Sequence, residues 1–173
     1  MYRLIIIDDE QVVREGIAEM IEWADLGFEL VAACRDGREG LAQISQQKPD
    51  VVITDICMPF IDGLELAGAI ADELPRTKTI LLTGYDEFDY AREAVKLKVH
   101  DFLLKPITAS ELSEMLAKLR TQLDVERDRR RKFEQLEEQL RTALPVYRER
   151  LLNRLVGTNS GGSVPGAALE LLE

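Results

Sequence analysis

The sequence predicts an α/β fold, in which helices cover both faces of a parallel sheet and a long helical extension follows. Two observations carry this prediction. In residues 1–122, short apolar runs typical of buried strands alternate with segments of helical periodicity. Beyond them, the apolar spacing is that of one long helix with a heptad repeat.

Five apolar runs are expected to form the strands. The run that ends on Asp55 is rich in β-branched residues and lacks polar alternation, which is typical of a strand buried on both faces of a parallel sheet. Pro59 prevents this strand from continuing. The five predicted strands are residues 4–7, 28–34, 51–55, 79–82 and 102–104.

Helical periodicity fills the gaps between these strands. The first helix is expected over residues 11–24, with Val13, Ile17, Met20, Ile21 and Ala24 on its inner face. Asp-Gly pairs at 36–37 and 62–63 open the next two helices, and Asp86 can cap a fourth. Thr108 and Glu111 fit a capping box, so the last helix should begin there.

Residues 123–155 are expected to form a helical coiled-coil linker, followed by a flexible tail over 156–173. Steps of four and three residues from Leu112 to Arg154 give 13 heptad positions, of which nine are apolar. Pro145 should kink or restart the helix. The basic run 127–132 could contact nucleic acid, but nearby acids favour a solvated coiled-coil face. The charged heptad positions are Glu126, Arg130, Glu137 and Arg154.

The composition narrows the class of protein. The net charge is −10 and the pI about 4.7, so the chain does not by itself indicate binding to nucleic acid or to an anionic membrane. Cys34 and Cys57 lack metal-ligand spacing and are expected to be free thiols of a reducing compartment. Neither a signal-peptide core nor a membrane-spanning segment is apparent, so we expect a cytoplasmic protein.

Chemically useful side chains gather at the predicted strand ends. Asp8 and Asp9 follow the first strand, Asp55 ends the third, Thr83 the fourth and Lys105 the fifth. In a sheet of order 2-1-3-4-5 the acids converge on one crevice at the switch point. Such carboxylates suit Mg²⁺, and a lysine and a hydroxyl opposite them suit a phosphoryl group carried on a nucleophilic aspartate. Asp55 as a mere turn cap remains the alternative.

These residues, together with Met58-Pro59, Gly63, Gly84 and Pro106, make the first 120 or so residues similar to the receiver domain of two-component response regulators. The resemblance implies a flavodoxin-like sheet of order 2-1-3-4-5. It also implies that a sensor histidine kinase is the partner that phosphorylates Asp55.

The resemblance further assigns a role to each matching residue. Asp9, Asp8, Asp55 and the backbone carbonyl of Cys57 would hold Mg²⁺, while Lys105 would hold the phosphoryl group before a cis peptide to Pro106. Thr83 and Phe102 would form the switch pair. Cys57 and Tyr85 would flank the approach of the water that removes the phosphoryl group.

A narrower resemblance extends past this domain. Residues 13–16, 84–88 and 144–155 are similar to response regulators with an AraC-type DNA-binding output domain. It implies a homodimerising regulator of transcription that contacts DNA only through a domain absent from these 173 residues.

Two other functions stay open at this point. One is a Mg²⁺-dependent aspartyl-phosphate enzyme, although the only histidine, His100, is expected at the opposite end of the sheet. The other is a coiled-coil scaffold with an inert receiver.

Overall fold

The computed structural model of the chain describes residues 1–84 and 99–157, with side chains up to residue 141. The helix predicted after Asp86 and the tail from residue 158 onward lie outside the described residues. The described elements are β1 (Tyr2–Ile7), α1 (Gln11–Met20), β2 (Phe28–Cys34), α2 (Gly37–Gln47), β3 (Val51–Asp55), α3 (Gly63–Glu73), β4 (Lys78–Thr83), β5 (Asp101–Leu104) and α5 (Ala109–Gly157).

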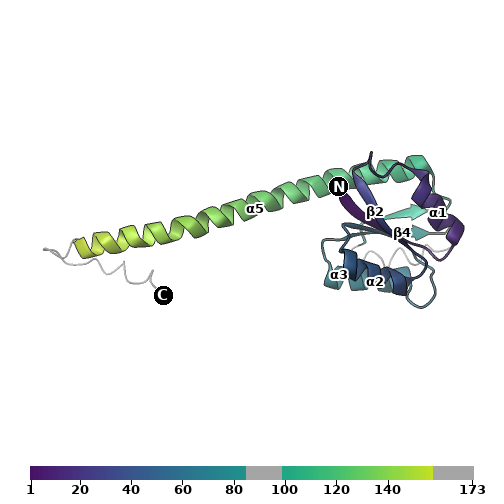
Figure 1. Cartoon of the computed structure of the whole chain (residues 1–173), viewed down its shortest axis with the longest axis horizontal. Helices are drawn as coiled ribbons and strands as arrows, with labels where there is room; N and C mark the ends of the chain where they lie inside the picture. The colour runs from purple at the N-terminus through teal and green to yellow at the C-terminus, as the bar shows by residue number, and fades with distance from the viewer. Residues whose placement is uncertain (85–98, 158–173) are drawn as a thin grey trace. The chain divides into compact units, whose positions relative to one another are not determined.

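The five strands form one parallel sheet in the order β2-β1-β3-β4-β5, which confirms the predicted fold class. α2 and α3 cover one face of the sheet, and α1 with the first turns of α5 covers the other (Figure 1). β1 lies between β2 and β3, with Ile7 beside Thr54 in the register, so the ends of β1 and β3 are adjacent. This edge of the sheet is where the predicted acids belong.

Both faces of the central strands are buried, as the uninterrupted apolar runs predict. Ile5, Ile7 and Val52 share one core cluster with Ile44 of α2 and Leu66 of α3. Successive residues of a strand point to opposite faces, so Leu4, Ile6 and Ile53 face the other layer. That layer also buries Ile17 and the leucines at 112, 116 and 119.

α1 ends at Met20, four residues earlier than predicted, because Ile21 has an extended backbone (φ −141°, ψ 155°). Trp23 folds back, and its indole N–H donates to the carbonyl of Ala18 at 2.8 Å. This bond satisfies a carbonyl that the shortened helix leaves without an intrahelical partner. Ala24, placed on the inner face by its spacing, is exposed.

Side-chain caps begin three of the described helices, among them α2, where Asp36 accepts from the N–H of Glu39 at 2.8 Å. Asp62 accepts from the N–H of Glu65 at 2.7 Å, and the Glu65 carboxylate accepts from the N–H of Asp62 at 3.3 Å. Thr108 and Glu111 make the same reciprocal pair at the start of α5. These caps fix the first turns of α3 and α5.

α5 runs without interruption through Pro145, so the expected restart at that proline is wrong. One proline removes one backbone donor, a loss that the described helix accommodates. The chain divides into two units, Met1–Gln122 and Leu123–Glu173, and α5 contributes to both.

The heptad interpretation needs correction at its first four positions. Leu112, Leu116, Leu119 and Leu123 are buried within the single chain, so they cannot form a seam with a partner. Phe133 and Leu140, farther along the same repeat, are exposed. In residues 1–84 and 99–157, no helix combines the length and the apolar character needed to cross a bilayer.

Candidate functional site

One lysine joins the two central strand ends. The ammonium of Lys105 lies 2.7 Å from Oδ1 of Asp55 and 2.9 Å from Oδ2 of Asp8. Lys105 follows β5, whereas Asp55 ends β3 and Asp8 follows β1. The lysine side chain therefore reaches across the end of β4. The backbone N–H of Lys105 donates to the carbonyl of Thr83 at 2.8 Å, which anchors the start of that reach at the end of β4.

Asp8 is held by its own loop. Its N–H donates to the carbonyl of Cys34 at 3.1 Å, which extends the pairing of β1 with β2 by one residue. Its Oδ1 accepts from the N–H of Glu10 at 2.9 Å, and its carbonyl accepts from the guanidinium of Arg14 at 2.6 Å. Oδ2 is buried, and among the described residues the Lys105 ammonium, at 2.9 Å, is its one polar contact.

The turn after Asp55 is equally constrained. The N–H of Ile56 donates to the carbonyl of Leu82 at 3.2 Å, and the N–H of Gly63 donates back to the carbonyl of Ile56 at 2.9 Å. Gly63 packs so close that a Cβ there would lie 2.1 Å from the carbonyl oxygen of Asp55. The start of α3 therefore presses directly against the end of β3.

At the top of this turn, Phe60 takes a left-handed backbone (φ 72°) and stays 68% exposed. The guanidinium of Arg38, in α2, lies 4.3 Å from the centroid of its ring. This cation–π contact ties the turn to the neighbouring helix.

The electrostatics of the site follow from burial. Burial raises the pKa of Asp8, and the nearby Lys105 ammonium only partly opposes this. Burial by itself would lower the pKa of Lys105, but hydrogen bonds and charges from Asp55 and Asp8 outweigh it, so its pKa lies above the usual value. Lys105 is therefore a permanent cation between two carboxylates. Glu10 is a third acid, with Oε1 3.6 Å from the ammonium.

The remaining predicted residues occupy the same edge, with one exception. Thr83 is half-buried at the end of β4, and Asp9 and Cys57 are exposed beside Asp8 and Asp55 in the chain. Tyr85 lies outside the described residues. The peptide between Lys105 and Pro106 is cis, as the resemblance implied. His100 pairs with Thr79 near the opposite end of β4, away from the acids, as expected.

Thr83 and Phe102 project from the same face of adjacent strands. Thr83 is in register with Leu104, and Leu81 with Phe102, and residues two apart in a strand share a face. Phe102 is half-buried against the cluster of Ile56, Leu64 and Leu81. The ring thus packs on the residue that follows Asp55 in the chain.

The oxygen ligands at this edge fit a small, hard cation. Among residues 1–84 and 99–157, no cluster of three or more His, Cys, Asp or Glu side chains could hold a metal ion. Mg²⁺ does not need one, because one or two carboxylates suffice when waters and phosphate oxygens complete its shell. Oδ2 of Asp8 and the carboxylate of Asp55, which both contact the Lys105 ammonium, supply such a donor pair.

The structure adds two residues that the sequence alone did not identify, Arg14 on the Asp8 carbonyl and Arg38 on Phe60, and it also places Glu10 beside Lys105. Glu10 carried a signal, since it is the third acid after β1. Arg14 and Arg38 carried none, because their contacts depend on loop geometry.

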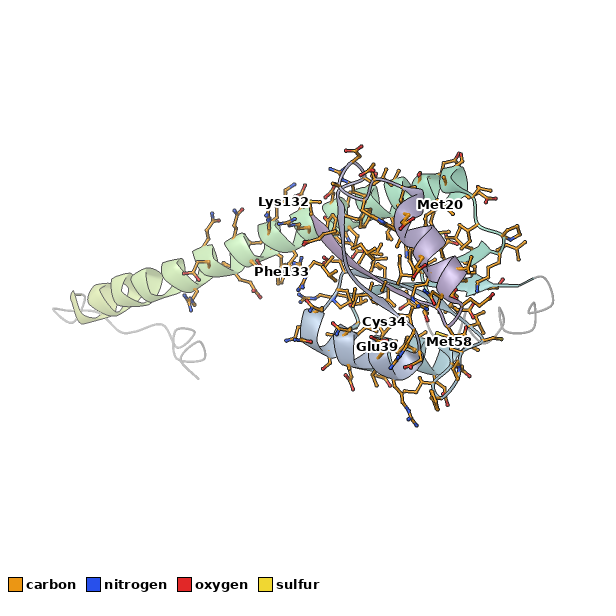
Figure 2. All side chains as sticks on the ribbon, turned by 45° about the vertical axis from the view of Figure 1, so that its right-hand side comes forward. Met20, Cys34, Glu39, Met58, Lys132 and Phe133 are labelled. Atoms are coloured by element: carbon orange, nitrogen blue, oxygen red, sulfur yellow. The ribbon has the colours of Figure 1, made fainter. Side chains whose placement is uncertain are left out.

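Figure 2 also shows Cys34 near Glu39 of α2. Burial, and then the charges of Glu39 and Asp36, raise the pKa of this thiol to about 12.

Comparison with known proteins finds similar sequences and similar folds. Residues 4–117 match the family of response regulator receiver domains. The chain is 34% identical over 177 residues to YesN of Bacillus subtilis strain 168, named as an uncharacterized transcriptional regulatory protein, covering 99% of this chain and 48% of YesN. It is 35% identical over 158 residues to the transcriptional regulatory protein HptR of Staphylococcus aureus strain N315, covering 90% of this chain and 62% of HptR.

The chain therefore spans about half to two thirds of the length of these relatives. Among solved structures, the REC domain of AraT, a response regulator from Geobacillus stearothermophilus, superposes with a TM-score of 0.71 at 42% identity. That match covers 73% of this chain and 98% of the other. A two-component transcriptional regulator AraC from Clostridium phytofermentans superposes with a TM-score of 0.64 at 31% identity, covering 68% of this chain and 92% of the other.

Proposed function

Because this chain belongs to the family of response regulator receiver domains, we propose that it is a phosphorylation-controlled switch whose phosphoacceptor is Asp55. The observation that carries the proposal is the Lys105 ammonium, held between Asp55 and Asp8 at 2.7 and 2.9 Å. A fixed cation at the nucleophile can neutralise the charge of an incoming phosphoryl group.

The carboxylate of Asp55 attacks the phosphorus of the donor. The bond between that phosphorus and the leaving group breaks, and the leaving group departs with its electron pair. Lys105 then pairs with the phosphoryl oxygens. Asp8, Asp9, Asp55 and the carbonyl of Cys57 would hold Mg²⁺, which supplies positive charge opposite those oxygens. The buried oxygen of Asp8, which already contacts a cation in the Lys105 ammonium at 2.9 Å, supports this role.

We assign the phosphoryl donor to a sensor histidine kinase, the partner that a two-component receiver requires. Cys34 and Cys57 are not joined in a disulfide, which supports a reducing, cytoplasmic setting for this exchange. The output would be a change in homodimerisation that controls transcription, with DNA contacted by a further domain outside these 173 residues. The names of YesN and HptR support a transcriptional role.

Thr83 and Phe102 would carry the signal from the site. Phosphoryl oxygens on Asp55 can draw in the Thr83 hydroxyl, and the Phe102 ring on the same face can then take the space it leaves. A phenyl ring makes no hydrogen bond, so packing against Ile56, Leu64 and Leu81 sets its position. A population shift needs such differential contacts between the two states.

Intact-mass analysis after incubation with acetyl phosphate and Mg²⁺ tests the proposed function. One phosphoryl group should appear on the wild type and none on Asp55→Asn. Asp62→Asn is the matched control, since asparagine also caps helices and the residue lies in the same turn. Label on Asp55→Asn, or label without Mg²⁺, would reject the assignment. Repeated turnover without retained label would favour the enzyme instead.

The lifetime of the label depends on access of water to Asp55. Cys57, exposed beside the site, and Tyr85 flank this approach by resemblance, and neither orients water well. We expect Tyr85→Ala with Cys57→Asn to speed loss of label about tenfold, or about 1.4 kcal/mol in the barrier. An unchanged decay rate would mean that these side chains do not set the lifetime.

A further inference from the structure

The part of α5 that lies in the second unit carries an exposed apolar stripe. Phe133, Leu136 and Leu140 are 61%, 54% and 54% exposed, at spacings of three and four residues that place them on one face of the helix. Figure 2 shows the start of this stripe at Phe133, next to Lys132. Three large apolar side chains in a row on a charged helix indicate a surface that a partner covers.

The sequence continues this stripe on an 11-residue repeat. Spacings of three, four and four residues lead from Phe133 through six further apolar positions toward the end of the helix: Leu136, Leu140, Leu144, Tyr147, Leu151 and Leu155. All seven positions are apolar. The strict heptad instead passes through Glu137 and Arg154 and omits Leu136.

An 11-residue repeat corresponds to about 3.67 residues per turn, close to the 3.6 of a straight helix, so the stripe stays on one face with only slight right-handed supercoiling. A straight, regular face of this kind matches another helix with the same repeat. A second copy of this chain provides one.

We propose that residues 133–155 pair with the same residues of a second copy as a parallel coiled coil on this 11-residue seam. The charges beside the stripe complement themselves in that arrangement. Lys132 lies on one flank and Glu137 on the other, so a parallel two-fold axis brings Lys132 of each copy next to Glu137 of the other. The ion pair of Arg141 with Glu138, at 2.9 Å within one helix, stays outside the seam.

This seam rests on the dimerisation in the proposed function, and it replaces the heptad as the surface of contact. The charged heptad positions Glu126, Arg130, Glu137 and Arg154 all fall outside it. No charge then needs to be buried between the two copies, which would otherwise cost more than its pairing returns.

Sedimentation equilibrium of the full chain, with and without acetyl phosphate and Mg²⁺, tests the seam. Leu136→Asn should weaken the dimer about tenfold or more, as expected for truncating a central apolar contact. Gln135→Asn is the matched control, because it introduces the same residue one position off the stripe and should leave the dissociation constant unchanged. An unchanged constant for Leu136→Asn, or a wild type that stays monomeric in both conditions, would overturn the proposal.

Orientation is tested by charge exchange. Lys132→Glu should weaken the dimer, and adding Glu137→Lys should restore it, because the pair re-forms with its signs reversed. In an antiparallel pair each flank faces the same flank of the other copy, so Lys132 does not meet Glu137. The double variant would then dimerise as weakly as the single one, and this result would overturn the parallel seam. Measuring the label on Asp55 in the same samples separates the two proposals. An Asp55 without label beside a Leu136-sensitive dimer rejects the switch alone, whereas the opposite result rejects the seam alone.

Discussion

Replacing Gly63 with alanine tests whether the contact between α3 and β3 holds the site together. The added Cβ would lie 2.1 Å from the carbonyl oxygen of Asp55 and 2.9 Å from the Cα of Ile56. Both neighbours are backbone atoms, so no side-chain rotation can relieve the overlap. Either the first turn of α3 or the end of β3 must move.

The expected cost has two parts. Overpacking of this kind typically costs about 1–3 kcal/mol. The movement also weakens the hydrogen bond from the Gly63 N–H to the Ile56 carbonyl, now 2.9 Å, which contributes about 1 kcal/mol. We therefore expect Gly63→Ala to lose about 3 kcal/mol in the free energy of unfolding, a large share of the roughly 5–15 kcal/mol of a typical domain.

Urea denaturation followed by the fluorescence of Trp23, the only tryptophan, measures this loss. Gly16→Ala is the matched control. Gly16 lies inside α1 with nothing within 4 Å of an added Cβ, so alanine there should stabilise the helix by up to about 1 kcal/mol. Equal stability of Gly63→Ala and the wild type, or a destabilised Gly16→Ala, would refute the packing argument. Labelling of Asp55 should fall only in Gly63→Ala.

Three further results are expected. In EDTA, Asp8→Asn should raise the free energy of unfolding at pH 7 by on the order of 1 kcal/mol. Because the folded state raises the pKa of Asp8, its charge costs stability above that raised pKa, so the gain should vanish below the ordinary carboxyl pKa of 3.8; a gain independent of pH in urea titrations would contradict this. Thr83→Ala should accept label on Asp55, but its dimer dissociation constant, measured by sedimentation equilibrium, should not change on phosphorylation. A change as large as that of the wild type would contradict the proposed link to Phe102. With a pKa of about 12, Cys34 should be thiolate in only about 10⁻⁴ of molecules at pH 8, so a thiol reagent should modify Cys57 first; two equally fast thiols would contradict this.

Local patterns were sufficient to predict the sheet and the cap positions. β-branched runs with helices between them predict a parallel sheet, whereas its strand order was implied by the resemblance to receiver domains. The end of α1 was not predictable in this way, because the indole of Trp23 competes with further helix for the Ala18 carbonyl. The apolar periodicity includes Ala24, but it carries no information about the hydrogen bond from Trp23 to Ala18.

The sequence predicted which residues form the site better than it predicted the contacts between them. The strand ends named Asp8, Asp55 and Lys105, and the structure brings all three together. The contacts of Arg14 and Arg38 arise from loops, whose course no spacing rule determines. The heptad prediction was wrong at its first four positions for a related reason: α5 contributes to the receiver core at Leu112–Leu123 and carries a separate exposed stripe from Phe133 onward, and a single repeat averaged the two.

The position of Lys105 between Asp8 and Asp55 also means that a cation binding in the resting site would exchange with the lysine ammonium. An arriving divalent cation has to compete with the ammonium for the oxygens of Asp8, so its apparent affinity is lowered by the contact it displaces. Once displaced from Asp8, the ammonium, which lies 2.7 Å from Asp55 in the resting site, is available to an anion at that carboxylate. Cation and phosphoryl group should consequently favour each other's binding, each by the same factor.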